Sequence, residues 1–347
     1  MAAKERQLNQ HVAATWFAEG ERQLGLGDTR KAIEAFRKAT SSDYENRDYI
    51  LALAQALATA GRTDEARYAL VRLRDAAPEN AEVNLDLARL AARRAEVADA
   101  SRYYHNALYG LWTGSEVDRQ QRQVRMELIR FLLDHQQRSA ALSELLVLES
   151  DLPDEADLQT QIAQLFLNAD DPNHALRHFR HALRADKHDG AALSGAGEAS
   201  FRLGDYAQAR RYLESAAEAG EKDGTQQSLV LTEMILNTDP LSPHLTREER
   251  GRRLRIGFDQ ALATLEACLS RSGGPVAAPD LEALHSTAIA TRPQLKPHAI
   301  GRDSEALESG IDLVTRMEEG VASRCGEPEG LDRALLLIGR KYKEVLP

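Results

Sequence analysis

The sequence is poor in cysteine and in aromatic residues, and it has no long apolar run. Two of its 347 residues are cysteines, and aromatic residues make up 5% of the chain. Two cysteines cannot form a disulfide framework or a complete zinc site. Few aromatic residues, together with abundant Ala, Leu, Arg and Glu, favour helices packed through small side chains over β-sandwiches or barrels. No run of about eighteen apolar residues occurs, so we expect no transmembrane segment.

Basic residues are outnumbered by acidic ones, and this excludes one class of partner. The formal net charge is −10, from 44 basic and 54 acidic residues. A general nucleic-acid binder concentrates Lys and Arg on one face to neutralise phosphates, so we expect no nucleic-acid partner. The basic residues are mostly arginines, and this bias, together with the richness in alanine, is typical of a GC-rich bacterial genome.

The N-terminal residues lack the apolar core of a secretory signal. The sequence therefore predicts a cytoplasmic protein by default. A periplasmic or membrane-tethered protein stays open as an alternative if an N-terminal signal or anchor has been removed. Cys268 and Cys325 bear on this choice, because they could pair in an exported protein and would otherwise be small buried thiols.

An alanine inside an apolar stretch recurs along the first two thirds of the chain. Successive alanines are 34 residues apart, except for one step of 41 that contains a seven-residue insertion. Apolar residues follow each alanine at four and seven positions, and this spacing predicts one face of a helix. The recurring alanines are Ala32, Ala66, Ala100, Ala141, Ala175 and Ala209.

A second helix is predicted before each alanine. The residue twelve positions earlier is small in five of the six cases, which allows two helices to approach closely. Five positions before the alanine stand Gly27, Gly61 and Gly204, a residue type that ends helices. Pro78 and Pro153, twelve positions after the alanine, stop the other helix. Each unit is therefore a helix, a tight turn and a second helix.

These units resemble the tetratricopeptide repeat, which has the same length of 34 residues. The best matches are residues 13–46, with Trp16 and Gly20, and residues 190–223, with Gly197. The resemblance implies an all-α fold, a right-handed α-α superhelix of stacked helix pairs, with a C-terminal helical capping region. It also implies a concave surface, lined by the first helix of each pair, that binds another protein.

The sequence predicts four segments. Residues 1–12 form an N-terminal segment, and residues 13–223 form six repeats, with the insertion near 115–121 expected as a loop at the edge of the solenoid. Residues 224–271 are interpreted as a distorted seventh repeat that caps the array. Residues 272–347 form a C-terminal helical region without the 34-residue period.

A strip of mixed charge is predicted on the first helices around the insertion. Its arginines would hold an extended acidic or amphipathic segment through charge-assisted hydrogen bonds. The alternative is that these residues are solvated helix faces, with ion pairs between positions i and i+4. The candidate partner-binding residues are Glu82, Asp86, Arg89, Arg93, Glu127, Arg130, Asp134 and Arg202.

Two further patterns concern metals and catalysis. His174, His178 and His181 have the spacing of one helix face, but arginines crowd the same helix and would repel a cation. We interpret them as surface histidines and expect no metal site and no cofactor. None of the motifs G-x-S-x-G, GK[ST] or H-E-x-x-H occurs, so we expect no enzyme activity.

The sequence thus predicts a protein–protein interaction scaffold that binds a partner peptide or protein in the groove of a solenoid. The alternative is a structural subunit of a larger complex, for instance in the cell envelope, that self-associates through its C-terminal helices. Neither the partner nor the oligomeric state follows from the sequence.

Overall fold

The computed structural model describes residues 2–150, 152–221, 224–271, 278–300 and 302–345. Within these ranges the chain is helical, with one isolated β-bridge between Asn80 and Leu111 and no strand. The chain divides into two compact units, Met1–Leu152 and Pro153–Pro347. No helix in the described ranges is both long enough and apolar enough to cross a membrane.

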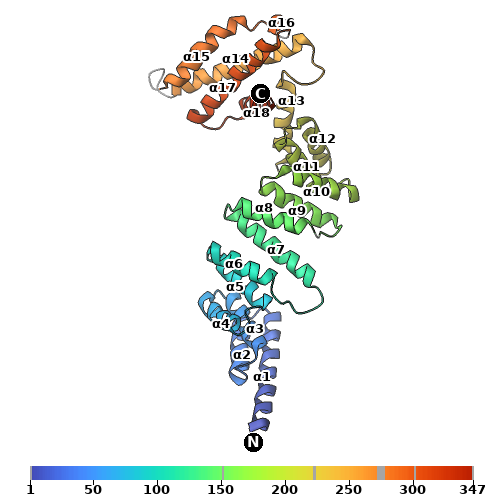
Figure 1. Cartoon of the computed structure of the whole chain (residues 1–347), viewed down its shortest axis with the longest axis vertical. Helices are drawn as coiled ribbons and strands as arrows, with labels where there is room; N and C mark the ends of the chain where they lie inside the picture. The colour runs from blue at the N-terminus through green and yellow to red at the C-terminus, as the bar shows by residue number, and fades with distance from the viewer. Residues whose placement is uncertain (1, 151, 222–223, 272–277, 301, 346–347) are drawn as a thin grey trace. The chain divides into compact units, whose positions relative to one another are not determined.

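The first unit consists of four helix pairs, in which each helix packs against the next one (Figure 1). A tight turn joins the two members of each pair. The helices are α1 (Ala2–Gly25), α2 (Thr29–Ser42), α3 (Arg47–Thr59), α4 (Thr63–Ala76), α5 (Ala81–Arg93), α6 (Val97–Leu108), α7 (Val117–Asp134) and α8 (Arg138–Glu149).

The second unit begins with two further pairs and continues into longer helices. The paired helices are α9 (Ala156–Asn168), α10 (Pro172–Ala185), α11 (Gly190–Arg202) and α12 (Tyr206–Glu218). The remaining elements are α13 (Thr225–Thr238), α14 (Arg247–Arg271), α15 (Pro279–Thr291), the 3-10 helix η1 (Arg292–Gln294), α16 (Pro297–Ile300), α17 (Ser304–Cys325) and α18 (Gly330–Val345).

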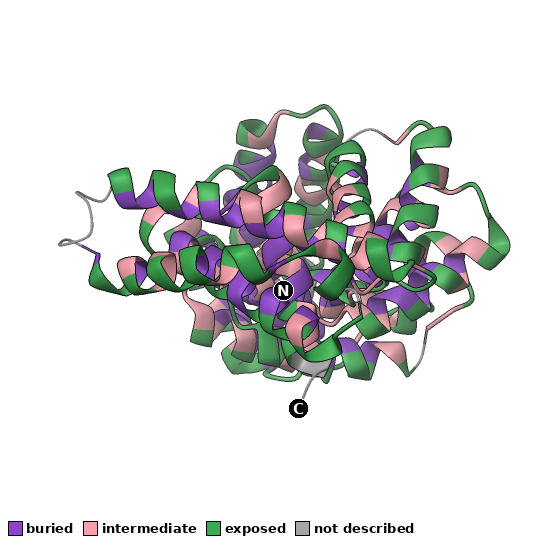
Figure 2. Cartoon of the chain, turned by 90° about the horizontal axis from the view of Figure 1, so that it is seen from above, coloured by how far each residue is buried: buried purple, intermediate pink, exposed green. Residues whose placement is uncertain are grey.

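The six recurring alanines are completely buried in the second helix of each pair, as the spacing predicts. Buried residues follow one stripe of a helix and exposed residues the opposite stripe (Figure 2). The small residues of the first helices are needed for this packing. A Cβ atom at Gly197 would lie 2.7 Å from the side chain of Leu213, and one at Gly20 would overlap the Phe36 ring. The predicted close approach of the paired helices is confirmed at these two positions.

The turn inside each pair has the same conformation in all six pairs. Gly27, Gly61 and Gly204 have φ angles of 77°, 74° and 71°. The equivalent residues of the other three pairs are not glycines but adopt the same left-handed conformation, which is uncommon for side chains with a Cβ atom. They are Ala95, Gln136 and Asp170, with φ angles of 55°, 59° and 66°.

The insertion forms less of a loop than the sequence indicates. Residues from Val117 onward belong to α7, so five of the seven residues of the expected loop at 115–121 are helical. Its Arg and Gln residues are good helix formers and lengthen the first helix of the fourth pair instead. The segment before α7 is held to the loop before α5, because the amide of Leu111 donates a 2.7 Å hydrogen bond to the carbonyl of Glu79.

Helix α13 has a different partner from the one that the sequence indicates. It packs against α12 of the preceding pair and against α18, where Ile235 shares a core cluster with Ala334 and Ile338. The Tyr342 hydroxyl of α18 also donates a hydrogen bond of 3.0 Å to the Asp239 carboxylate. Helix α14 packs instead against α17, so α13 and α14 do not form the expected seventh helix pair. The segment boundaries predicted at residues 223 and 271 stay predictions.

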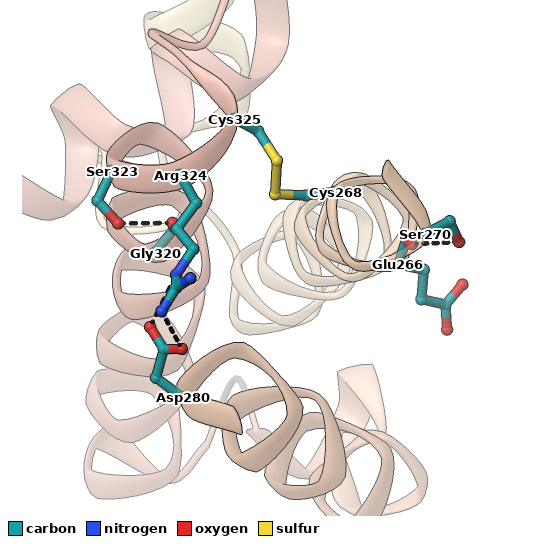
Figure 3. Close-up of a disulfide and its surroundings, with 8 residues drawn as sticks. All are labelled: Glu266, Cys268, Ser270, Asp280, Gly320, Ser323, Arg324 and Cys325. Atoms are coloured by element: carbon teal, nitrogen blue, oxygen red, sulfur yellow. Dashed lines mark hydrogen bonds and ion pairs between the residues drawn. A yellow bond between two sulfur atoms is a disulfide. The ribbon is translucent and has the colours of Figure 1, made fainter. Parts of the chain in front are cut away.

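A disulfide links two helices of the second unit. Cys268, near the end of α14, is bonded to Cys325, the last residue of α17, and their Cα atoms are 6.0 Å apart (Figure 3). Beside it, Arg324 forms an ion pair of 2.8 Å with Asp280 of α15 (Figure 3). The three helices share one hydrophobic core. The choice between a disulfide and free thiols, which the sequence left open, is therefore a disulfide in this structure.

Candidate functional site

The predicted charged strip contains a bidentate ion pair between two first helices. The Arg89 guanidinium of α5 donates to both carboxylate oxygens of Glu127 on α7, at 2.6 and 3.0 Å. Arg89 is also 3.9 Å from Asp86 of its own helix. Such a fork-to-carboxylate pair fixes orientation as well as charge. It joins the third and fourth helix pairs of the first unit.

Asp86 connects the same strip to α3. Its carboxylate accepts a 2.8 Å hydrogen bond from the Gln55 side-chain amide. Burial raises the pKa of Asp86 above its ordinary value, although the Gln55 hydrogen bond and the charge of Arg89 act in the opposite direction. The carboxylate is thus a partly desolvated acceptor held between two neighbours.

Arg93 and Arg202 each donate to a backbone carbonyl, and Arg202 also pairs with Glu198, one turn earlier on α11, at 2.8 Å. Arg93 donates a 3.0 Å hydrogen bond to the carbonyl of Ala58, near the end of α3. Arg202 donates a 2.9 Å bond to the carbonyl of Leu167, near the end of α9. The last carbonyls of a helix lack partners within the helix and carry partial negative charge, so a guanidinium stabilises them. Both arginines thereby tie a first helix to the first helix of the preceding pair.

A cavity of about 230 Å³ lies between α3 and α5. Gln55 and Thr59 line it from α3, and Asp86, Arg89 and Arg93 line it from α5. Its polar groups are held by the hydrogen bonds described above, so their positions are set before any partner arrives. The cavity presents two guanidinium groups and one carboxylate at its wall.

Arg130 and Asp134 extend the strip along α7. Both side chains are exposed, and neither has an ion-pair partner among the described residues. Glu82, at the other end of the strip, accepts a 3.3 Å hydrogen bond from the Thr113 hydroxyl. We call these seven residues together with Gln55 the α3–α7 surface. Its members are Gln55, Glu82, Asp86, Arg89, Arg93, Glu127, Arg130 and Asp134.

The structure brings most of the predicted residues together. Asp86, Arg89 and Arg93 line one cavity and Glu127 joins them through Arg89, whereas Arg202 belongs to the second unit. The main pair of this surface joins two helices, whereas the alternative of ion pairs along single helices describes the contacts of Arg89 with Asp86 and of Arg202 with Glu198. Its use for partner recognition stays a prediction.

The histidines of α10 differ in part from the interpretation as surface residues. His178 is 7% exposed, lies 5.4 Å from the Phe166 ring and is hydrogen-bonded to Gln159 at 2.7 Å. His178 lies at a position of the helix that faces the core. The sequence did not indicate this, because arginines alternate with the histidines along α10. Across the described residues, no group of three or more His, Cys, Asp or Glu side chains is placed to hold a metal ion.

Comparison with protein families identifies the repeats. Models described as tetratricopeptide repeat match residues 17–81 and 166–231. These ranges cover helix pairs in both units. The chain contains tetratricopeptide repeats. Tetratricopeptide repeats imply a protein–protein interaction scaffold, and proteins of this fold are generally not catalysts.

Curated relatives resemble this chain over a short stretch. Cellulose synthase operon protein C of Komagataeibacter sucrofermentans is 37% identical over 87 residues, which cover 25% of this chain and 7% of that protein. The protein of the same name from Komagataeibacter xylinus is 38% identical over 85 residues, or 6% of its length. The match thus spans less than a tenth of each relative.

Two solved structures align with part of this chain. YrrB, described as having an unusual peptide-binding site, is 16% identical, with a TM-score of 0.45, over 56% of this chain and 96% of that one. PilW, a type IV pilus biogenesis factor, is 18% identical, also with a TM-score of 0.45, over 63% of this chain and 98% of that one.

Proposed function

We propose that the α3–α7 surface binds an extended segment of a partner protein. The observation that carries this proposal is the cavity whose wall is formed by Asp86, Arg89 and Arg93. Their hydrogen bonds within the protein hold them in place, so little side-chain entropy is lost when a partner contacts them. A solvated helix face without such a cavity would offer a partner no enclosed contact.

The chemistry of the surface indicates what the partner segment carries. Arg130 and Asp134 are exposed and lie one helical turn apart on α7, so they are available to charges of both signs. The cavity adds guanidinium donors, which suit carboxylate or backbone carbonyl acceptors. The partner segment is therefore polar and of mixed charge, with at least one acidic residue placed at the cavity.

A capture experiment with matched variants tests this function. The full chain is immobilised through its C-terminus and exposed to a lysate of its source organism, and bound proteins are quantified by mass spectrometry. Arg130→Glu reverses an exposed charge of the α3–α7 surface. Arg138→Glu reverses an exposed charge on the second helix α8 and serves as the control. We expect that Arg130→Glu captures less of one protein than the wild type does, and that Arg138→Glu captures the same amount of it as the wild type. Equal capture by both variants would move the binding site elsewhere.

We also propose, as a second candidate function, an assembly subunit that works outside the cytoplasm. The observation that favours it is the Cys268–Cys325 disulfide, since disulfides persist in oxidising compartments and are rare in the cytosol. The local resemblance to cellulose synthase operon protein C is compatible with an operon-encoded complex but covers too little of that protein to identify one. Light scattering at increasing concentration tests self-association, and thiol titration of protein purified from its source tests the compartment.

A further inference from the structure

A larger cavity lies in the first unit on the other face of α3. It has a volume of about 870 Å³ and lies between α2, α3 and α4. Ile50, Leu53 and Leu57 line it from α3, whereas Gln55 and Thr59 line the cavity of the α3–α7 surface. At 100° per residue these two sets point to opposite sides of the helix. The larger cavity, called here the α2–α4 cavity, is therefore a separate place on the protein.

The cavity is lined by a small side chain at a position where later repeats have large ones. Three residues after the buried alanine, α4 carries Ala69, which lines the cavity. The same position holds Tyr103 in α6, and Glu144, His178 and Tyr212 in the three pairs that follow. Of the five helix pairs that come after the first pair, α3–α4 alone has alanine at this position.

Tyr103 shows what the larger side chain does. It is 5% exposed, its hydroxyl accepts a 2.8 Å hydrogen bond from Arg74, and the Arg102 guanidinium lies 5.0 Å from the ring centre. A cavity that Tyr103 lines measures about 10 Å³. Thr40 occupies the position of Arg74 one repeat earlier and lines the α2–α4 cavity. The α2–α4 cavity thus lacks both the ring and the guanidinium that fill the equivalent place.

The uncompensated charges at its rim are positive. The three acidic residues that line the cavity are already paired with arginines: Glu45 with Arg6 at 3.0 Å, Asp64 with Arg94 at 2.9 Å, and Glu65 with Arg37 at 2.8 Å. Arg47 and Arg72 also line the cavity, and both are exposed. Neither has an ion-pair partner in the part of the chain that the structure describes.

Two exposed tyrosines complete the rim. Tyr44 is 72% exposed and Tyr68 is 68% exposed, and both line the cavity. Aromatic rings at a surface contribute large contact area at low entropic cost, and they pair favourably with other rings. The volume lies within the range of cavities that bind ligands. An apolar floor, two exposed rings and two uncompensated guanidinium groups define the chemistry of an occupant.

We propose that the α2–α4 cavity binds an acidic peptide segment of a protein partner through an aromatic side chain. The ring enters beside Ala69, in the place that Tyr103 fills one repeat further on. Carboxylates flanking the ring pair with Arg47 and Arg72. This site is independent of the α3–α7 surface, so the protein can hold two segments, one on each face of α3.

Fluorescence anisotropy with the full chain tests the proposal. The probe is a fluorescein-labelled helical peptide with Phe and Leu on one face and Glu on the other. Two matched peptides carry Lys in place of Glu, or Ala in place of Phe and Leu. Ala69→Tyr places a ring where the ring of the peptide would enter, and Arg72→Glu reverses a rim charge. Arg138→Glu is the charge control, and Arg130→Glu separates this site from the α3–α7 surface.

The acidic aromatic peptide is expected to bind the wild type, and both Ala69→Tyr and Arg72→Glu should weaken binding about tenfold or more, roughly 1.4 kcal/mol. Arg138→Glu and Arg130→Glu should leave the affinity unchanged, and melting followed by circular dichroism should show that each variant is folded. The proposal is overturned by absent binding to the wild type, by equal binding of the Lys peptide, or by unchanged affinity in Ala69→Tyr. A wild-type dimer that Ala69→Tyr dissociates would also overturn it, since the occupant would then be a second copy.

Discussion

The side chain of Arg93 donates a hydrogen bond of 3.0 Å to the backbone carbonyl of Ala58, one helix pair earlier in the chain. Arg202 makes the same contact with the carbonyl of Leu167, at 2.9 Å, in the second unit. In both cases the arginine and the carbonyl are 35 residues apart, one repeat length plus one residue. The same contact therefore joins neighbouring first helices in both units. It gives Arg93 and Arg202, which were predicted as recognition residues, a structural role.

We predict that Arg93→Ala destabilises the first unit by about 1 kcal/mol, because a carbonyl at the end of α3 loses its charged donor. Thermal unfolding of the full chain measures the effect. Arg138→Ala removes an exposed arginine without a described partner and should leave the melting midpoint unchanged. Equal melting of both variants would show that the Ala58 contact contributes nothing.

We predict that Ala66→Leu destabilises the protein by roughly 1–3 kcal/mol through overpacking, because Ala66 is 0% exposed between paired helices. Ala69→Leu is the matched control on the same helix. Ala69 is half-buried and lines the α2–α4 cavity, so there is space for the larger side chain. Similar melting of the two variants would contradict the close approach assigned to Ala66.

The helix pairs could be predicted from the sequence because their contacts are local. The stripe around Ala66 and the glycine at position 61 lie within one repeat, and the repeat occurs six times, 34 residues apart except for one step of 41. A fixed period reveals a close-packed position even where single residues are uninformative. The positive φ of Ala95, Gln136 and Asp170 could not be foreseen in this way, since the repeat imposes a conformation that these residues do not favour themselves.

Contacts between segments that are distant in the chain could not be predicted from the sequence. The hydrogen bond between Tyr342 and Asp239 joins residues that are 103 positions apart in the sequence, and the 34-residue period of the repeats does not predict it. The Arg89–Glu127 pair spans 38 residues across the insertion. The α2–α4 cavity was missed for another reason: its wall includes the small side chain of Ala69, and an alanine in an alanine-rich helix gives no signal unless its neighbours in register are compared.

Glu318 of α17 makes stability depend on pH. Its side chain is 0% exposed, and neither carboxylate oxygen has a hydrogen-bond partner among the described residues. Burial, with a smaller contribution from the charge of Asp332, raises the pKa of Glu318 to about 8. Asp332 itself accepts hydrogen bonds from Gln260 and Thr264 of α14. The fold therefore favours the protonated form of Glu318.

Because the pKa is raised above that of the unfolded chain, the stability that protonated Glu318 provides is complete below about pH 4.5 and is lost as pH rises through 8. We predict that Glu318→Gln, which cannot ionise, has a melting midpoint close to that of the wild type at pH 5 and a higher one at pH 9. Thermal unfolding at both values measures the difference. A difference that is the same at the two pH values would contradict the assignment.

We predict that the disulfide stabilises the second unit. It closes a loop with a sequence separation of 57 residues, and bonds of this kind typically contribute roughly 2–4 kcal/mol. Reduction with dithiothreitol should lower the melting midpoint of the wild type. A variant with Cys268→Ser and Cys325→Ser should melt at the lower temperature whether or not reductant is present. An unchanged wild type under reducing conditions would mean that the bond adds no stability.

The affinity of an identified partner for Arg130→Glu, compared with that for Arg138→Glu, tests the central claim most directly. Titration calorimetry measures both against the wild type. If the α3–α7 surface binds the partner, reversing the exposed charge of Arg130 weakens binding about tenfold or more, equivalent to roughly 1.4 kcal/mol. Arg138→Glu should bind as the wild type does, and both variants should keep the wild-type melting midpoint. Full affinity in Arg130→Glu would contradict recognition at this surface.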